Sequence, residues 1–386
     1  MVKFDFFWPT EFIFGAGEFE KAGGKAAALG KKALLVTGGR SARRTGVYGR
    51  LLSGLEKAGV EVVPFEGIAP NPKAGSVDRG GLIAAEENCE FIIGLGGGSV
   101  MDAAKAIAAA AVHPGSIWEY MNSFKGFREI TSKTLPIIEI PTVSGTGSEG
   151  NATAVISNAE TLEKSYIKSR HLFPACSVID PELVFTVPAR ITAASGADIV
   201  CHVLEPYINA SESFETTLLM TEAFMKNVVL SLRKAVENGK DAFARSNLAW
   251  VSTLCCSPFR GLGLGGIGSL HHMEHSLSGR FNIPHGEGLC ALLPSWLEFM
   301  ESAAPERIER FGLSVFGERD ALPAVRKWLD SIGMGLSLKD FKIGEDSIGA
   351  LVSDTIRVYG KGEDFIPNGR WTLSPEDIEK IYRRAF

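Results

Sequence analysis

The first half of the chain alternates short apolar segments with helix-like segments, and this alternation constrains the fold more than any other feature. The apolar segments have the length of buried strands: 32–37, 60–65, 91–95 and 135–141. The segments between them have helical character: 45–58, 77–88 and 101–112. Strands that are apolar along their whole length are typical of a parallel sheet that helices cover on both faces. The first half therefore predicts an α/β domain of the Rossmann-like kind.

The second half of the chain shows helical periodicity and little strand pattern. Helices are predicted over 217–236, 241–253, 305–311 and 374–382. The last of these opens with Ser374 as the N-cap and Pro375 at the first helical position. A chain of 386 residues is long enough for two domains of ordinary size. We place the boundary near Phe185, which predicts an α/β domain over 1–185 and an all-helical domain over 186–386.

Composition excludes several classes of function. The net charge of -5 argues against a nucleic-acid-binding surface, and no apolar run approaches the roughly 20 residues that a membrane helix needs. The N-terminus lacks the basic, apolar and small-residue pattern of a signal peptide. Six cysteines without a CxxC pair favour reduced thiols. We expect a cytoplasmic protein that acts on a small molecule, with neither nucleic acid nor membrane as a partner.

A glycine-rich loop joins the third predicted strand to the helix that follows it. Without side chains, glycines let backbone N–H groups approach a pyrophosphate closely, and the helix N-terminus adds partial positive charge. The loop is neither a GxGxxG fingerprint nor a Walker A motif. A tight turn without a ligand is the alternative. The positions in this loop that we predict to bind a cofactor are Gly96, Gly97, Gly98, Ser99 and Asp102.

A second polar loop follows the fourth predicted strand. Small hydroxyl residues and glycines at the carboxyl end of a parallel strand are typical of a loop that faces a ligand. The alternative is an ordinary surface loop, which the presence of two such loops at one sheet edge makes less favourable. The residues of this loop that we predict to contact the cofactor are Thr142, Ser144, Thr146 and Ser148.

Four of the seven histidines lie between positions 271 and 285. Asp198 and His202 are four residues apart, as are His271 and His275, so each pair shares a helix face. His285 stands in a Pro-His-Gly turn. Imidazole and carboxylate ligands suit Zn²⁺ or Fe²⁺, and a site without thiolates is typical of a catalytic metal. Taken singly, Asp198 is more easily explained as a helix cap and His202 as a core histidine.

These motifs resemble the iron-containing, group III alcohol dehydrogenase family along nearly the whole chain. The residues that carry the resemblance are GGGSVMD at 96–102 with AKA at 104–106, PT at 141–142 with GTGSE at 145–149, IDPEL at 179–183, Asp198 with HVLE at 202–205, and EHSLS at 274–278 with PHG at 284–286. The last two groups are similar to the butanol-dehydrogenase-like, aldehyde-reducing branch. The resemblance implies the two-domain architecture of dehydroquinate synthase-like proteins, with the active site in the cleft between the domains. We also expect a homodimer.

The resemblance assigns roles to individual residues. It implies one divalent metal with four ligands, which are Asp198, His202, His271 and His285. Fe²⁺ is the expected metal and Zn²⁺ the alternative. His275 matches a family histidine that lies near the nicotinamide without binding metal. Lys164 matches a lysine that reaches the cofactor.

The implied activity is reversible hydride transfer between a nicotinamide and a primary alcohol or its aldehyde, with aldehyde reduction as the expected direction in the cell. The metal would act as a Lewis acid on the substrate oxygen, and His275 would relay the proton. Polyol oxidation of the glycerol dehydrogenase kind is one alternative. A metal-dependent lyase or hydrolase of a phosphorylated substrate and a catalytically silent binding protein are two others.

The end of the first predicted strand bears on the choice of nicotinamide. NAD users in this family tend to carry an acidic residue there, which bonds the ribose hydroxyls and repels a 2′-phosphate. Here Gly38 and Gly39 leave room, and Ser41 with an arginine among Arg40, Arg43 and Arg44 would bind the phosphate. The sequence therefore predicts NADP(H), with NAD(H) as the alternative.

Two departures from the family pattern bear on the site. Pro206 stands where a helix should continue, so we expect a kink there. Five glycines crowd residues 261–268, ahead of His271. Because glycine is a poor helix former, we expect this run to loosen the presentation of His271 and to widen the substrate pocket.

Overall fold

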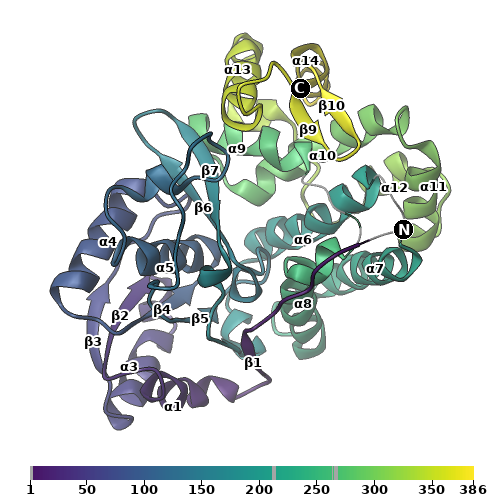
Figure 1. The fold of residues 1–386 in the computed structure, drawn as a ribbon. Helices are drawn as coiled ribbons and strands as arrows, with labels where there is room; N and C mark the ends of the chain where they lie inside the picture. The colour runs from purple at the N-terminus through teal and green to yellow at the C-terminus, as the bar shows by residue number, and fades with distance from the viewer. Residues whose placement is uncertain (1–2, 211–213, 263, 265–267) are drawn as a thin grey trace. The chain divides into compact units, whose positions relative to one another are not determined.

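The computed structural model describes residues 3–210, 214–262, 264 and 268–386. The chain divides into two compact units (Figure 1). One unit is Trp8–Val187, called the α/β unit below, and the other consists of Met1–Phe7 with Pro188–Phe386, called the helical unit. Among the described residues, no helix combines the length and the apolar character that crossing a membrane requires. All six cysteines are buried, and none of them forms a disulfide with another described residue.

A six-stranded sheet forms the centre of the α/β unit, and all its pairings are parallel. In spatial order its strands are β1 (Glu11–Phe14), β8 (Cys176–Ile179), β5 (Ile137–Pro141), β4 (Phe91–Gly96), β2 (Lys32–Thr37) and β3 (Glu61–Phe65). The four strands that the apolar runs predicted are β2, β3, β4 and β5. The parallel sheet expected from the sequence is thus confirmed.

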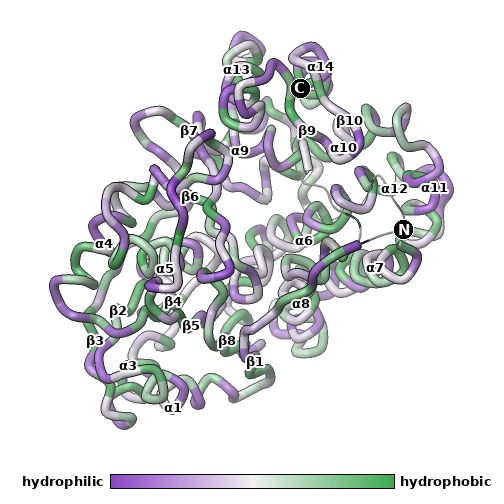
Figure 2. Tube along the Cα trace, viewed as in Figure 1, coloured by the Kyte–Doolittle hydropathy of each residue, from purple (hydrophilic) through white to green (hydrophobic). Residues whose placement is uncertain are grey.

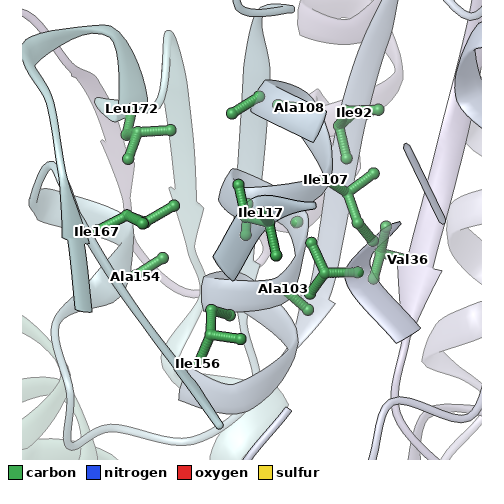
Figure 3. Close-up of a cluster of buried hydrophobic side chains, with 14 of the residues drawn as sticks. Val36, Ile92, Ala103, Ile107, Ala108, Ile117, Ala154, Ile156, Ile167 and Leu172 are labelled. Carbon is green, nitrogen blue, oxygen red and sulfur yellow. The ribbon is translucent and has the colours of Figure 1, made fainter. Parts of the chain in front are cut away.

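Helices cover both faces of the sheet. Two helices, α1 (Ala22–Ala27) and α3 (Val47–Lys57), cover one face of the sheet (Figure 1). They form a hydrophobic core with the side chains that β2, β4 and β5 direct to this face. On the other face, α4 (Ala74–Glu86) and α5 (Gly98–Ala110) pack against the alternate side chains of the same strands. Figure 3 shows this second core, where small residues of α5 meet side chains of β2 and β4. Burial on both faces explains why the strands are apolar throughout.

The strand order reverses between β2 and β4. From β2 the chain moves outward to β3, and it then returns to the opposite side of β2 to form β4. In open α/β sheets this reversal opens a crevice at the carboxyl ends of the two strands, where ligands bind. The loops that follow β2 and β4 therefore flank the expected binding crevice.

The sequence did not predict β1, β8 or the hairpin formed by β6 (Thr153–Asn158) and β7 (Glu163–Lys168). The hairpin is antiparallel and lies outside the main sheet, with apolar side chains packed against the core beside α5. Its strands alternate polar and apolar residues, and β1 and β8 have only four residues each. Such short or mixed segments carry a weak signal of strand structure.

Helices make up most of the helical unit. They are α6 (Ala189–Asn209), α7 (Glu215–Glu237), α8 (Ala242–Cys255), α9 (Ser269–Phe281), α10 (His285–Glu301), α11 (Pro305–Phe311), α12 (Ala321–Ser331), α13 (Ile348–Tyr359) and α14 (Pro375–Arg384). In Figure 2 hydrophilic and hydrophobic stretches alternate along these helices, as expected of helices with one buried face. The prediction of a purely helical domain needs one correction, because β9 (Ile366–Asn368) and β10 (Trp371–Leu373) form a short antiparallel ladder.

The proline expected to disturb a helix lies inside α6. The helix continues through Pro206 for three further residues and ends at Asn209. Ser374 caps α14 as predicted, since its hydroxyl accepts a hydrogen bond from the Asp377 N–H at 3.3 Å. The Asp377 carboxylate accepts in return from the Ser374 N–H, which completes a capping box.

Two glycines on α4 give a matched test of the packing between α4 and α5. A Cβ at Gly81 would lie 2.7 Å from the Cβ of Ala110, whereas a Cβ at Gly75 would meet nothing within 4 Å. We expect Gly81→Ala to lower the free energy of unfolding by about 1–3 kcal/mol through overpacking. Gly75→Ala should leave it unchanged or raise it by about 0.5 kcal/mol. Urea unfolding of both variants measures this, and equal effects at the two positions would contradict the close packing.

Candidate metal centre and cofactor loops

Three imidazole nitrogens converge on one carboxylate oxygen in the helical unit. The Nε2 atoms of His202, His271 and His285 lie 3.2, 3.4 and 3.8 Å from Asp198 Oδ1. Asp198 and His202 come from adjacent turns of α6, while His271 lies in the first turn of α9 and His285 is the first residue of α10. All four residues predicted as metal ligands are thus brought together.

The donor set fits a divalent metal ion. Asp198 Oδ1 and His271 Nε2 are buried, and neither has a hydrogen-bond partner among the described residues. Burying such atoms without a partner is costly, and a cation between them would satisfy both. Nitrogen and carboxylate oxygen donors without thiolates suit Fe²⁺ or Zn²⁺.

The electrostatics of these residues also favour a positive charge at this point. Burial alone would raise the pKa of Asp198, but the neighbouring His202, His285 and His271 lower it below its ordinary value. Burial lowers the pKa of His271, and the carboxylates of Glu205 and Asp198 outweigh that effect and raise it to about 9. The same carboxylates that hold a proton on His271 would stabilise a metal ion.

Two further carboxylates orient the histidines, and neither was predicted from the sequence to have a role. Glu205 Oε1 lies 3.0 Å from His271 Nδ1, and the Glu274 carboxylate is hydrogen-bonded to His285 Nδ1. A carboxylate at Nδ1 keeps the proton on that nitrogen, so that Nε2 is left free to bind a metal. Glu205 follows Asp198 by seven residues on α6, a spacing on one helix face that would have revealed it.

Glu205 also explains the glycine ahead of His271. Its Oε1 accepts the backbone N–H of His271 at 2.8 Å, in the first turn of α9. A Cβ on Gly268 would lie 0.9 Å from Glu205 Oε2, so only glycine fits there. Gly268 precedes α9 instead of interrupting it, and Glu205 anchors His271 at both its backbone and its ring. Gly263, Gly265 and Gly266 lie outside the described residues.

His275 stands beside this group of residues. Its Nδ1 is hydrogen-bonded to the hydroxyl of Tyr359, and its ring centroid lies 6.3 Å from that of His271. His275 also lies close to Glu274 and His285, which together could form a second group of metal donors. The Glu274 carboxylate, however, is hydrogen-bonded to Nδ1 of His285. Tyr359 lies 84 residues away in the sequence, so no local pattern could have linked it to His275.

The two predicted cofactor loops adjoin one another in the α/β unit. The N–H of Thr142 donates to the Gly96 carbonyl at 2.9 Å, just where β4 and β5 end. A Cβ on Gly98 would lie 2.4 Å from the side chain of Thr146, and one on Gly96 would lie 2.6 Å from Val100. Glycine is therefore required at both positions. Gly97 is the N-cap residue of α5, so the loop leads directly into the N-terminus of that helix.

The side chains of these loops fall into two groups. The hydroxyls of Ser99, Thr142 and Ser144 have no hydrogen-bond partner within the described chain, and all three residues are half-buried. Ser148 Oγ instead donates to Asp102 Oδ1 at 2.6 Å, while Asp102 Oδ2 accepts from the Val155 N–H at 2.9 Å. Asp102 and Ser148 thus join α5 to the second loop. The three unpartnered hydroxyls are those that can serve a ligand.

The loop after β2 holds the residues predicted to bind a 2′-phosphate. Gly38 lies beside the end of β3, since its carbonyl accepts the Gly67 N–H at 2.9 Å. Arg43 is hydrogen-bonded to Glu66 through Nε at 2.7 Å and also through Nη2, and it stacks over Tyr48. The Arg43 guanidinium lowers the pKa of Glu66. An acidic residue, Glu66, therefore lies beside this loop at the end of β3, and it was not predicted from the sequence.

Lys164 comes from β7 and is buried. Its Nζ donates to Asn71 Oδ1 at 3.0 Å, and Asn71 holds a left-handed backbone with φ of 53°. The peptide N–H of Ser157 bonds the Pro72 carbonyl, which attaches this turn to β6. Asn71 lies between Pro70 and Pro72 after β3, a rigid turn that the sequence analysis did not single out.

Comparison with known proteins agrees with this architecture. Residues 9–181 match the model of the iron-containing alcohol dehydrogenase family, and residues 192–386 match its C-terminal counterpart, the Fe-containing alcohol dehydrogenase family, C-terminal. NADH-dependent butanol dehydrogenase A of Clostridium acetobutylicum is 33% identical, with 100% of both chains covered. The 1,3-propanediol dehydrogenase of Klebsiella pneumoniae is 32% identical over 99% of each chain.

Solved structures show the same relationship. The crystal structure of NADH-dependent butanol dehydrogenase A from Thermotoga maritima superimposes with a TM-score of 0.93 at 34% identity, covering 100% of this chain and 99% of that one. The chain belongs to the iron-containing alcohol dehydrogenase family. At that level its activity is nicotinamide-linked interconversion of an alcohol and an aldehyde.

Replacing the orienting carboxylate tests its role in metal binding. Glu205→Gln keeps the size of the side chain but removes the charge that holds the proton on His271 Nδ1. We expect the affinity for Zn²⁺ to fall about 10- to 100-fold. Competition with a chromophoric chelator measures this affinity. Glu215→Gln, at the exposed start of α7, is the control and should leave it unchanged; equal affinity in both variants would contradict the role given to Glu205.

Proposed function

We propose that this enzyme reduces short primary aldehydes with NAD(H) and that Asp198, His202, His271 and His285 hold its metal. The observation that carries the proposal is the convergence of three Nε2 atoms on the unpartnered Asp198 Oδ1. The expected metal is Fe²⁺, as the family description implies, and Zn²⁺ is the second candidate. A site of the glycerol dehydrogenase kind, with one Asp and two His, would leave the fourth donor without a role.

Each part of the chain has a distinct task in this proposal. When bound, the metal supplies a Lewis acid that stabilises negative charge on the substrate oxygen. Glu205 and Glu274 keep the protons of His271 and His285 on Nδ1, so that both ligands stay in the binding tautomer. His275, hydrogen-bonded to the Tyr359 hydroxyl, moves the proton to and from the substrate oxygen.

The α/β unit binds the nicotinamide cofactor. Backbone N–H groups of Gly97, Gly98 and Ser99, at the N-terminus of α5, would hold the pyrophosphate. The half-buried hydroxyls of Thr142 and Ser144 are further donors. Lys164, positioned by Asn71, would reach a ribose hydroxyl. The homodimer and the cytoplasmic location stay predictions from the sequence.

Two observations favour NAD(H) over the NADP(H) that the sequence analysis predicted. Glu66 engages the guanidinium of Arg43, so this arginine is not available to a 2′-phosphate. Gly67, next to Glu66, bonds Gly38, so this ion pair lies beside the end of β2. The C. acetobutylicum relative is named as NADH-dependent, in agreement with this choice.

Turnover of a simple aldehyde tests the proposed function. Protein purified without air should oxidise NADH when butanal is added, and a chelator should abolish this activity. Fe²⁺ or Zn²⁺ should restore it, and Asp198→Asn should lose at least about 100-fold in kcat/KM because the central ligand oxygen is lost. Activity that survives complete metal removal, or an Asp198→Asn variant with ordinary activity and metal content, would overturn the assignment.

The choice of nicotinamide has its own test. Glu66→Gln frees the Arg43 guanidinium and removes a negative charge, so kcat/KM with NADPH should rise about tenfold relative to NADH. Steady-state kinetics with both cofactors give the ratio for the wild type and the variant. Glu20→Gln, which breaks an exposed ion pair with Arg50 in the same unit, is the control. A wild-type preference for NADPH would refute the proposed cofactor.

A further inference from the structure

Arg260 lies directly behind one of the proposed metal ligands. Its Nη1 is 3.3 Å from His202 Nδ1, while Nε2 of the same ring is 3.2 Å from Asp198 Oδ1. A short helical turn, η6 (Pro258–Gly261), sets this position, since Ser257 Oγ caps it by accepting from the Phe259 N–H at 3.2 Å. The guanidinium and the central carboxylate are therefore separated by a single imidazole.

Arg260 has no acidic partner in the part of the chain that the structure describes. Within the described residues its side chain makes one hydrogen bond, to His202, and no carboxylate lies within ion-pair distance. Two other partly buried arginines of the helical unit are paired, Arg280 with Asp354 at 2.7 Å and Arg310 with Glu222 at 2.6 Å. Arg307 instead lies over the Tyr207 ring, with no carboxylate of the described residues within ion-pair distance. A half-buried guanidinium without a counter-ion is costly to fold, so a ligand that supplies one would be bound favourably.

The contact with His202 does not suit a metal-loaded site. A neutral imidazole carries one N–H, and the nitrogen that binds a metal must be the unprotonated one. With Nε2 directed at the metal, Nδ1 would carry the proton and face the N–H groups of Arg260. Two donors cannot bond each other, so Arg260 would need another acceptor. A carboxylate matches the fork of N–H groups that a guanidinium presents.

We propose that Arg260 binds the carboxylate of the substrate and that the physiological substrate is a short aldehyde bearing a carboxylate at its far end. The inference rests on the proposed function, because it places the carbonyl oxygen at the metal. The substrate must be short, since only the ring of His202 separates Arg260 from Asp198. A simple alkyl aldehyde of equal length would leave the guanidinium without an acceptor.

Two substrates of equal chain length test the proposal. In the wild type, kcat/KM for 4-oxobutanoate should exceed that for butanal by about 10- to 100-fold, the effect of one charge-assisted contact. In Arg260→Gln this ratio should fall toward one, and Arg260→Lys, which keeps the charge but loses the fork, should be intermediate. Arg319→Gln removes the same charge from an exposed site and should keep the wild-type ratio. Melting temperature and metal content show that each variant is folded and loaded.

A binding measurement separates substrate recognition from turnover. Calorimetric titration of the zinc-loaded, cofactor-free protein should show tighter binding of 4-hydroxybutanoate than of 1-butanol, by the same 10- to 100-fold. Arg260→Gln should lose this advantage. A wild type without preference for the carboxylate, or a preference retained in Arg260→Gln, would overturn the proposal. Failure to reduce either aldehyde would instead count against the proposed function, and the titration would still decide the role of Arg260.

Discussion

The helical unit is organised around the buried oxygen of Asp198. Three imidazole nitrogens approach this atom within 3.8 Å, although bringing polar groups together away from water without hydrogen bonds is costly. Such an arrangement is stable only if a positive charge, a proton or a metal ion, occupies the space between the donors. Because α6, α9 and α10 each supply a donor, the packing of these helices and the binding of a cation depend on one another.

The residues around the donors explain several features of the local sequence. Glu205 binds both the ring and the backbone of His271, and Gly268 is the residue that leaves room for its carboxylate. Glu274 orients His285 in the same way. Gly268 thus lies just before the helix begins, at the point where close approach is needed. Gly268, which by itself disfavours a helix, leaves the space that the Glu205 carboxylate needs to reach His271.

In the α/β unit the comparable constraint is the reversal of strand order between β2 and β4. It brings the ends of these strands to one crevice, where the first helix turn of α5 presents backbone N–H groups. Asp102 and Ser148 bond each other there and hold the two loops together, while neighbouring hydroxyls remain available. Glu66, which follows β3, lies at the same edge and pairs with Arg43. The positive charge that the residues after β2 suggest is therefore partly neutralised.

The sequence by itself determined the parallel α/β unit and the helical second half, because strand and helix periodicity are local properties. Helix spacing also pointed to Asp198, His202, His271 and His285, but their selection as metal ligands came from the family resemblance and stays a prediction. The sequence also placed β2, β3, β4, β5 and the helices between them. It did not determine β1, β8 or the β6–β7 hairpin, whose short or mixed strands become stable only on the finished core. Contacts between distant residues were decided by the tertiary structure alone: Tyr359 with His275, Glu66 with Arg43, and Arg260 with His202. Such pairs have no signature in one sequence, since their energy depends on distances that only the packed chain defines.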